Sequence, residues 1–419
     1  MAETTGKRMT HIDTPCVPPR SHVLRESQFI RFILSTLTWS TGHMLVLMSN
    51  SFLIYDMTGS GLWLAALGTA LAVPQFIFAG IGGVLADRVP RRVMLISGST
   101  VGTLTMSILA AIGFSGALEP WHIVASGVAF GAALGNDWTA RQAFITNLVR
   151  RNQLVRAVSF DQTSFHFSRI VAPIMGGYLL SRFGGEGMFI LGAISFFIAT
   201  LLLVSLRPRQ AIEERQPPLW EGVSDAFSKI RKDTVVLVVL VFTIVNAIFL
   251  GGFIYLVPSY AKDVFGGGAL EQGAVLTGMG IGAVVGALWL GWRGNVRRAG
   301  FAMLLTNAVT VLVIGGFSIS TVLIASVVLA FVAGAVNAVH ITLGTVAIQT
   351  SVEDEMRGRV FGIYEMAWGF FPAGGIVFGG LLAAFGPEAA LLIGVVGTGM
   401  VTVVIWFASP AIRAYTLNQ

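Results

Sequence analysis

Ionisable side chains lie inside long apolar runs of this chain of 419 residues, where a charge is costly and needs a reason, and five of them stand out. They are Asp137, Glu365, Arg169, His340 and His43. Within a membrane, a carboxyl group or an imidazole can take up a proton on one side and release it on the other. These residues are therefore candidates for proton coupling. A structural role in a gate is an equal alternative for the two acids, and hydrogen-bonded packing is the alternative for the two histidines.

Arg169 is the deepest of these charges. It lies about 12 Å beyond Asp161 along a helix, and His166 precedes it by three residues on the same helix face. As a cation beside a cavity it would pair with an acid or bind an anionic substrate. The alternative is an internal ion pair that fixes helix packing.

The composition is that of an integral membrane protein. Hydrophobic residues make up 54% of the chain and charged residues 11%, against about 25% in soluble domains. The apolar runs are long enough to span a bilayer as helices and lack the alternation of a membrane barrel. We predict an all-α fold of twelve spans, at approximately 29–53, 60–84, 93–115, 120–142, 161–182, 187–206, 234–257, 270–291, 299–318, 320–344, 360–384 and 388–408.

Basic residues gather in alternate gaps between these spans. By the positive-inside rule, both termini and every basic loop then face the cytoplasm of a bacterial-type inner membrane. The net charge of +6 thus reflects topology, and we expect no nucleic-acid partner. Residues 1–28 lack the apolar core of a signal peptide and are expected to form a disordered tail. Cys16 is the only cysteine, so no disulfide or thiolate metal site is expected within one chain. No bound cofactor is expected either.

The spans divide into two sets of six. We predict a six-helix bundle over 29–206, a cytoplasmic linker with an amphipathic helix over 207–233, a second bundle over 234–409, and a tail over 410–419. A shift of 203 residues places Gly176-Gly177 on Gly379-Gly380 and Asp137 on His340. Such a repeat is typical of transporters whose parallel halves are related by a pseudo-two-fold axis, with the substrate site between them.

The turn between the second and third spans carries a family resemblance. The motif Gly83-x-x-x-Asp87-Arg88-x-x-Arg91-Arg92 resembles the loop signature of the major facilitator superfamily. The segments 141–149, 169–177 and 349–360 are similar to the enterobactin-exporter and macrolide-efflux branch. Pro90 departs from the usual glycine, and Gly127 stands near the place of the mid-helix arginine of many drug:proton antiporters. Proton coupling through that arginine is therefore not available here.

The resemblance implies a gate, a helix motif and a substrate cavity. In the gate, Asp87 would cap the eleventh span and pair with Arg141 on the fourth. The gate residues are Gly83, Asp87, Arg88, Arg91, Arg92, Arg141 and Arg359. An antiporter-like motif comprises Pro173, Gly176 and Gly177, with ordinary packing as the alternative. The cavity candidates are Trp39, Asn50, Gln75, His166, Asn246, Phe249, Asn337, Tyr364 and Trp368.

These features predict a secondary active transporter of the major facilitator fold. It would be a proton-driven, monomeric exporter of an amphipathic small molecule such as a drug, a macrolide or a siderophore-like compound, working in contact with membrane lipid. An importer or facilitator of a metabolite is the first alternative. A receptor or a membrane-embedded enzyme is disfavoured, because the chain has no HExxH motif, Walker loop or cysteine pair.

Overall fold

The computed structural model describes residues 26–86, 89–145, 147–149, 153–207, 230–231, 233–294, 296–352 and 354–416. This part of the chain is helical and contains no strand. Eight of its helical segments are long and apolar enough to cross a membrane. The all-α membrane class is therefore confirmed, while the count of twelve spans stays a prediction. The predicted linker helix and most of the amino-terminal tail lie outside the described residues.

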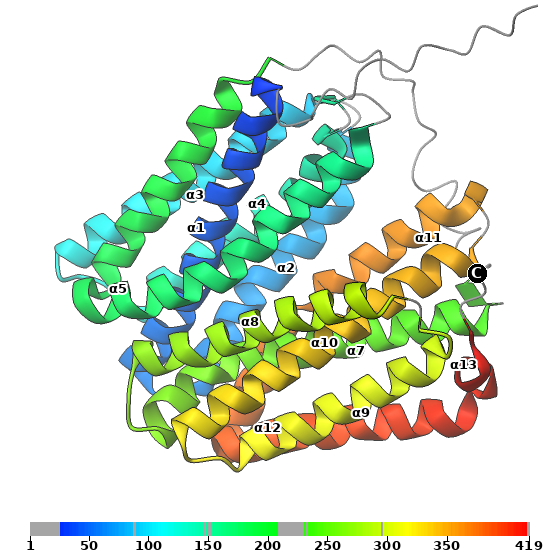
Figure 1. Cartoon of the computed structure of the whole chain (residues 1–419). Coiled ribbons are helices and arrows are strands. Elements are labelled where there is room, and N and C mark those ends of the chain that lie inside the picture. Colours follow the sequence, from blue (N-terminus) through cyan, green and yellow to red (C-terminus); the bar gives the residue numbers. More distant parts are fainter. Residues whose placement is uncertain are drawn as a thin grey trace, which may run out of the picture.

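The helices form two bundles (Figure 1). The first bundle contains α1 Ser27–Thr58, α2 Gly61–Ala86, α3 Arg91–Phe114, α4 Pro120–Ile145 and α5 Leu154–Val204. The second contains α7 Thr234–Ser259 with a π-helical turn Tyr260–Val264, α8 Ala269–Arg293, α9 Ala299–Ser318, α10 Leu323–Ser351, α11 Asp354–Ala367 with a 3-10 turn Trp368–Phe370, α12 Ala373–Ala408 and α13 Pro410–Ala414.

Two of these helices are interrupted by a glycine. Gly184 within α5 has φ 66° and Gly386 within α12 has φ 81°, so each leaves the helical conformation. Only glycine adopts such positive φ values without strain. The chain turns at both points, where the sequence predicts the ends of the fifth and eleventh spans.

The two bundles meet at the end where α1 stops and α8 begins, which we call the closed end (Figure 1). There Lys262 of the π-helical turn donates to the Asp56 carboxylate over 2.7 Å, and Tyr55 donates to Asp263. Gln272 of α8 donates to the Met48 carbonyl of α1 over 3.4 Å. These hydrogen bonds join the two bundles at this end.

Small residues also bring the two bundles into contact. A Cβ added at Gly177 of α5 would lie 2.8 Å from the Ala269 carbonyl oxygen of α8. On the other side, a Cβ at Gly61 of α2 would lie 2.4 Å from the Gly379 carbonyl oxygen of α12. Toward the opposite end the bundles diverge, and the starts of α1 and α7 lie apart (Figure 1).

Candidate functional site

A buried arginine joins three helices of the first bundle. Arg141 of α4 donates from Nε to Asp137 Oδ2 over 3.3 Å, one turn earlier on the same helix. Its Nη1 donates to Thr36 Oγ1 of α1 over 3.0 Å, and that hydroxyl donates to Asp161 Oδ1 of α5 over 2.8 Å. The guanidinium also lies 4.7 Å from the ring centroid of Trp39. The polar residues Thr36, Asp137, Arg141 and Asp161 therefore form one network, which we call the Arg141 cluster.

The Arg141 cluster is almost closed to solvent. Arg141 and Asp137 are each 1% exposed, and Asp161 is 2% exposed. Two carboxyl groups face one guanidinium, so the fully ionised cluster carries one excess negative charge. An uncompensated charge at this depth is costly, and uptake of one proton by either carboxyl group removes it. One bound proton therefore makes the cluster electrically neutral.

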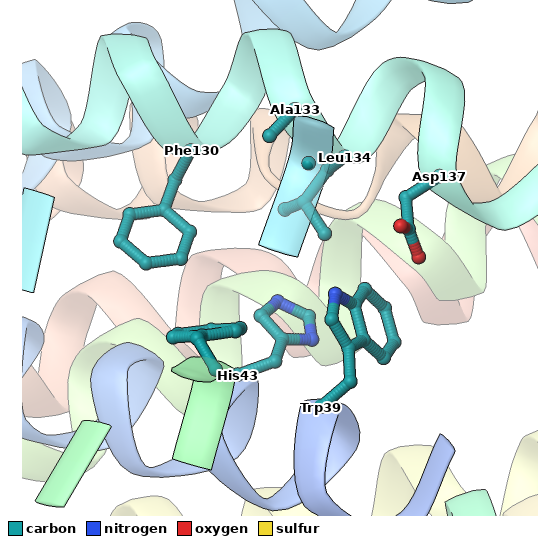
Figure 2. A pocket seen from close by; sticks show the side chains of 8 residues that line it. Trp39, His43, Phe130, Ala133, Leu134 and Asp137 are labelled. Carbon is teal, nitrogen blue, oxygen red and sulfur yellow. The ribbon is translucent and has the colours of Figure 1, made fainter. Parts of the chain in front are cut away.

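A cavity of about 10 Å³ lies beside the cluster, between α1, α3, α4 and α5. This is room for about one water. Trp39 and His43 of α1 and Asp137 of α4 line it (Figure 2). Neither Asp137 Oδ1 nor His43 Nδ1 has a hydrogen-bond partner among the described residues. A Cβ at Gly98 of α3 would come within 3.2 Å of Asp137 Oδ1, so this glycine leaves space beside the carboxyl group.

Arg169 lies on α5 where this helix contacts α8. A Cβ at Gly280 of α8 would lie 3.1 Å from the Arg169 carbonyl oxygen, which places Arg169 at the junction of the two bundles. Among the described residues no carboxylate forms an ion pair with it. The described part of the chain thus provides no acidic partner for Arg169.

His340, the repeat counterpart of Asp137, is held inside the second bundle. Its Nδ1 lies 3.1 Å from the Met303 carbonyl oxygen of α9, and its Nε2 lies 3.3 Å from Asn246 Nδ2 of α7. A ring that donates from Nδ1 to the carbonyl and accepts at Nε2 satisfies both contacts as neutral imidazole. Phe242 packs edge-on against the ring. These contacts suit a residue that joins α7, α9 and α10.

Most of the predicted cavity residues pack within one bundle. Trp39, Asn50, Asn246, Phe249 and Tyr364 are buried, and Gln75, Asn337 and Trp368 are half-buried. Phe249 of α7 packs against Phe378 of α12, with ring centroids 6.0 Å apart. Asn50 donates to Ser126 over 3.2 Å. Its Oδ1 and the Oε1 of Gln75 have no hydrogen-bond partner in the described part of the chain, so each retains an unused acceptor.

The predicted gate is described only in part. Arg92 of α3 donates to the Leu203 carbonyl oxygen over 3.1 Å and to that of Val204, which caps the end of α5. Asp87 and Arg88 lie outside the described residues, and so do the surroundings of Gly83 and the side chains of His166, Arg359 and Glu365. Their functional roles stay predictions. Pro173 and Gly177 of the antiporter-like motif both lie against Gly273 of α8.

The sequence analysis missed two members of the cluster, Thr36 and Asp161. It used Asp161 as the boundary of the fifth span, whereas α5 begins at Leu154, about two turns earlier. Asp161 is therefore embedded in the bundle. A fifth span predicted to begin earlier would have shown it as a carboxyl group inside a helix. Thr36 carries no such signal, because a threonine in an apolar helix is usually bonded to its own backbone. Among the described residues, no group of His, Cys, Asp or Glu could hold a metal ion.

The chain matches known transporters along most of its length. Residues 21–417 match the family model MFS_3, described as transmembrane secretion effector. The enterobactin exporter EntS of Shigella boydii serotype 4 (strain Sb227) is 29% identical over 336 residues, which cover 78% of this chain and 79% of that protein. EntS of Shigella flexneri is 28% identical over 323 residues, 75% of each chain.

Solved structures of transporters share the fold. A bacterial homolog of the human lysosomal transporter Spinster, in an inward-facing and occupied conformation, has a TM-score of 0.72 at 12% identity and covers 94% of this chain and 98% of its own. The nucleoside transporter NupG has a TM-score of 0.70 at 16% identity, and the match covers 93% of this chain and 100% of NupG. Together with the family match, these similarities confirm the major facilitator fold. The chain therefore belongs to the transmembrane secretion effector family of the major facilitator superfamily, and it is a multi-pass secondary transporter, not an enzyme.

Proposed function

We propose that this transporter exports a siderophore-like, amphipathic small molecule across a bacterial inner membrane and is driven by proton entry. Similarity to enterobactin exporters supports the cargo class. The unmatched negative charge of the Arg141 cluster supports proton coupling and is the observation on which the proposal rests. We further propose that both termini are cytoplasmic and that the protein acts as a monomer.

The arrangement of the bundles suggests how transport and protonation are linked. Contacts at the closed end join the bundles there, while the bundles diverge toward the opposite end, which the basic loops predict to be cytoplasmic. Export by alternating access requires the closed end to separate. The Arg141 cluster ties α1 to α4 and α5, so a change in its charge alters how α1 is held against the rest of its bundle.

Arg169 supplies the expected contact with an anionic cargo. It lies at the junction of the bundles and has no carboxylate ion partner among the described residues. A half-buried cation without an acidic partner is stabilised by binding an anion, which favours negatively charged substrates. The importer alternative has no specific support in the structure.

Reconstituted proteoliposomes test both parts of the proposal. An imposed pH step should drive transport of a labelled siderophore by the wild type, and Asp137→Asn should abolish this drive while counterflow exchange persists. Glu119→Gln, a change in an exposed loop, is the matched control and should behave as wild type. Retention of full pH-driven transport by Asp137→Asn and by Asp161→Asn would refute coupling through the cluster.

A second measurement addresses the cargo. Arg169→Gln should weaken transport of an anionic substrate at least tenfold more than that of a neutral amphipathic dye, because it removes one charge–charge contact of about 1.5–3 kcal/mol. Equal losses for both substrates would show that Arg169 is structural.

A further inference from the structure

A groove of about 250 Å³ lies on the membrane-facing side of the second bundle, between α9 and α12. Its walls include Phe301 and Leu305 of α9 and Val403, Trp406 and Phe407 of α12. It is an open groove at the surface, and Leu305, Val403 and Phe407 are exposed along it. The site lies outside the first bundle and shares no residue with the Arg141 cluster.

The groove does not favour water. Apart from the indole N–H of Trp406, its one polar lining group is the Thr402 hydroxyl, which accepts from Asn307 over 2.5 Å and donates to the Thr398 carbonyl oxygen over 2.8 Å. That hydroxyl already has a partner in each direction, and the remaining walls are apolar. A water needs two to four polar partners, whereas hydrocarbon needs none. A saturated chain is therefore the occupant that the walls suit.

One end of the groove is basic. Phe301 and Trp406 pack edge to face with centroids 5.9 Å apart, and the Arg413 guanidinium lies 5.8 Å from the Trp406 ring. Arg298 is the N-cap of α9 and lies one turn from Phe301 on the same helix face. Both arginines are exposed, and neither forms an ion pair with a carboxylate in the described part of the chain.

The two arginines are held near each other by backbone contacts. Gly300 of α9 donates its N–H to the Tyr415 carbonyl oxygen over 3.2 Å, and a Cβ at Gly300 would overlap the Ile412 carbonyl. The short helix α13, which carries Arg413, is therefore anchored against the start of α9. From this basic end the apolar groove continues to Ala308, about 10 Å along α9.

We propose that this groove is a binding site for an anionic glycerophospholipid. One acyl chain occupies the space between α9 and α12, and the phosphate lies between Arg298 and Arg413. Anionic lipids are attracted to basic residues at the cytoplasmic surface by about 1 kcal/mol per residue, and the positive-inside pattern predicts that this end faces the cytoplasm. Occupancy would fasten the ends of α9 and α12 to one another.

Lipid retention by the purified full-length transporter tests the proposal. Detergent-solubilised protein is mixed with equal amounts of phosphatidylglycerol and phosphatidylcholine, and bound lipids are counted by native mass spectrometry. Wild type should prefer phosphatidylglycerol. The double variant Arg298→Gln, Arg413→Gln should lose about 25-fold of its affinity, about fivefold for each arginine. Ala308→Phe, which fills the groove, should reduce retention of phosphatidylglycerol while both arginines remain.

Arg293→Gln provides the matched control, because Arg293 is an exposed arginine at the end of α8, away from the groove. It should bind phosphatidylglycerol as wild type does. Glycerol 3-phosphate at millimolar concentration should not compete, because it lacks the acyl chain. The proposal is overturned if wild type retains the two lipids equally, or if the double variant keeps the preference for phosphatidylglycerol. It is also overturned if Arg293→Gln loses as much affinity as the double variant, or if glycerol 3-phosphate competes. A dimer whose interface covers the groove would overturn it as well.

Discussion

Replacement of Arg141 by methionine should be among the most damaging single changes in the first bundle. Methionine keeps much of the side-chain volume but removes the guanidinium, so Asp137 and Asp161 stay buried without a cation. Removal of one partner of a buried ion pair costs about 3–5 kcal/mol. At about 2–4 °C per kcal/mol for a domain of 150–250 residues, the apparent melting temperature should fall by roughly 6–20 °C.

The companion variant Asp137→Asn should be far milder. It removes one of the two carboxylates. Arg141 and Asp161 remain, linked by the Thr36 hydroxyl, so the cluster then holds one positive and one negative charge. A cost of about 1 kcal/mol is expected from the weakened bond to Nε. Adding Asp137→Asn to Arg141→Met should therefore restore part of the lost stability.

Thermal unfolding of the purified variants in detergent, followed by tryptophan fluorescence, gives the comparison. The expected order of melting temperature is wild type, Asp137→Asn, the double variant and Arg141→Met. If Asp137→Asn loses as much stability as Arg141→Met, or if the double variant is no more stable than Arg141→Met, the charge count of the cluster is wrong.

Three further changes have distinct expected outcomes. Gly177→Leu should cost about 1–3 kcal/mol of stability and reduce transport, because the larger side chain forces the bundles apart. The control is its repeat counterpart Gly380→Leu, which should melt as wild type does because a Cβ there would meet no atom within 4 Å. Equal melting temperatures of the two variants would contradict the contact at Gly177. Asp56→Asn should change stability by less than about 1 kcal/mol, because the side chains of Lys262 and Asp56 are 38% and 48% exposed; a larger fall in melting temperature would reveal a stronger lock. His340→Leu should cost about 1–3 kcal/mol and leave the pH profile of transport unchanged, and a shifted profile would instead assign this histidine to the proton path.

The sequence determined the class of the protein and the position of its helices along the chain. Hydropathy is a local property, since a run of apolar residues must be covered by lipid or by other helices wherever it lies. The predicted starts near residues 60, 120 and 270 therefore agree closely with α2, α4 and α8. The same local property identified Asp137 and Arg169 as embedded charges that need a reason, whereas Arg141 was singled out through the family resemblance.

The partners themselves were decided only by the tertiary structure. Arg141 bonds to Asp137 on its own helix and to Thr36, which lies 105 positions earlier, because α1 and α4 turn these faces toward each other. Helix α5 begins about two turns before the predicted span, and for this reason the sequence analysis did not recognise Asp161 as an embedded carboxyl group. The closed end and the basic groove likewise join residues from distant helices. Hydrophobic pattern determines which segments enter the membrane, but the rotation and packing of helices determine which polar groups meet there.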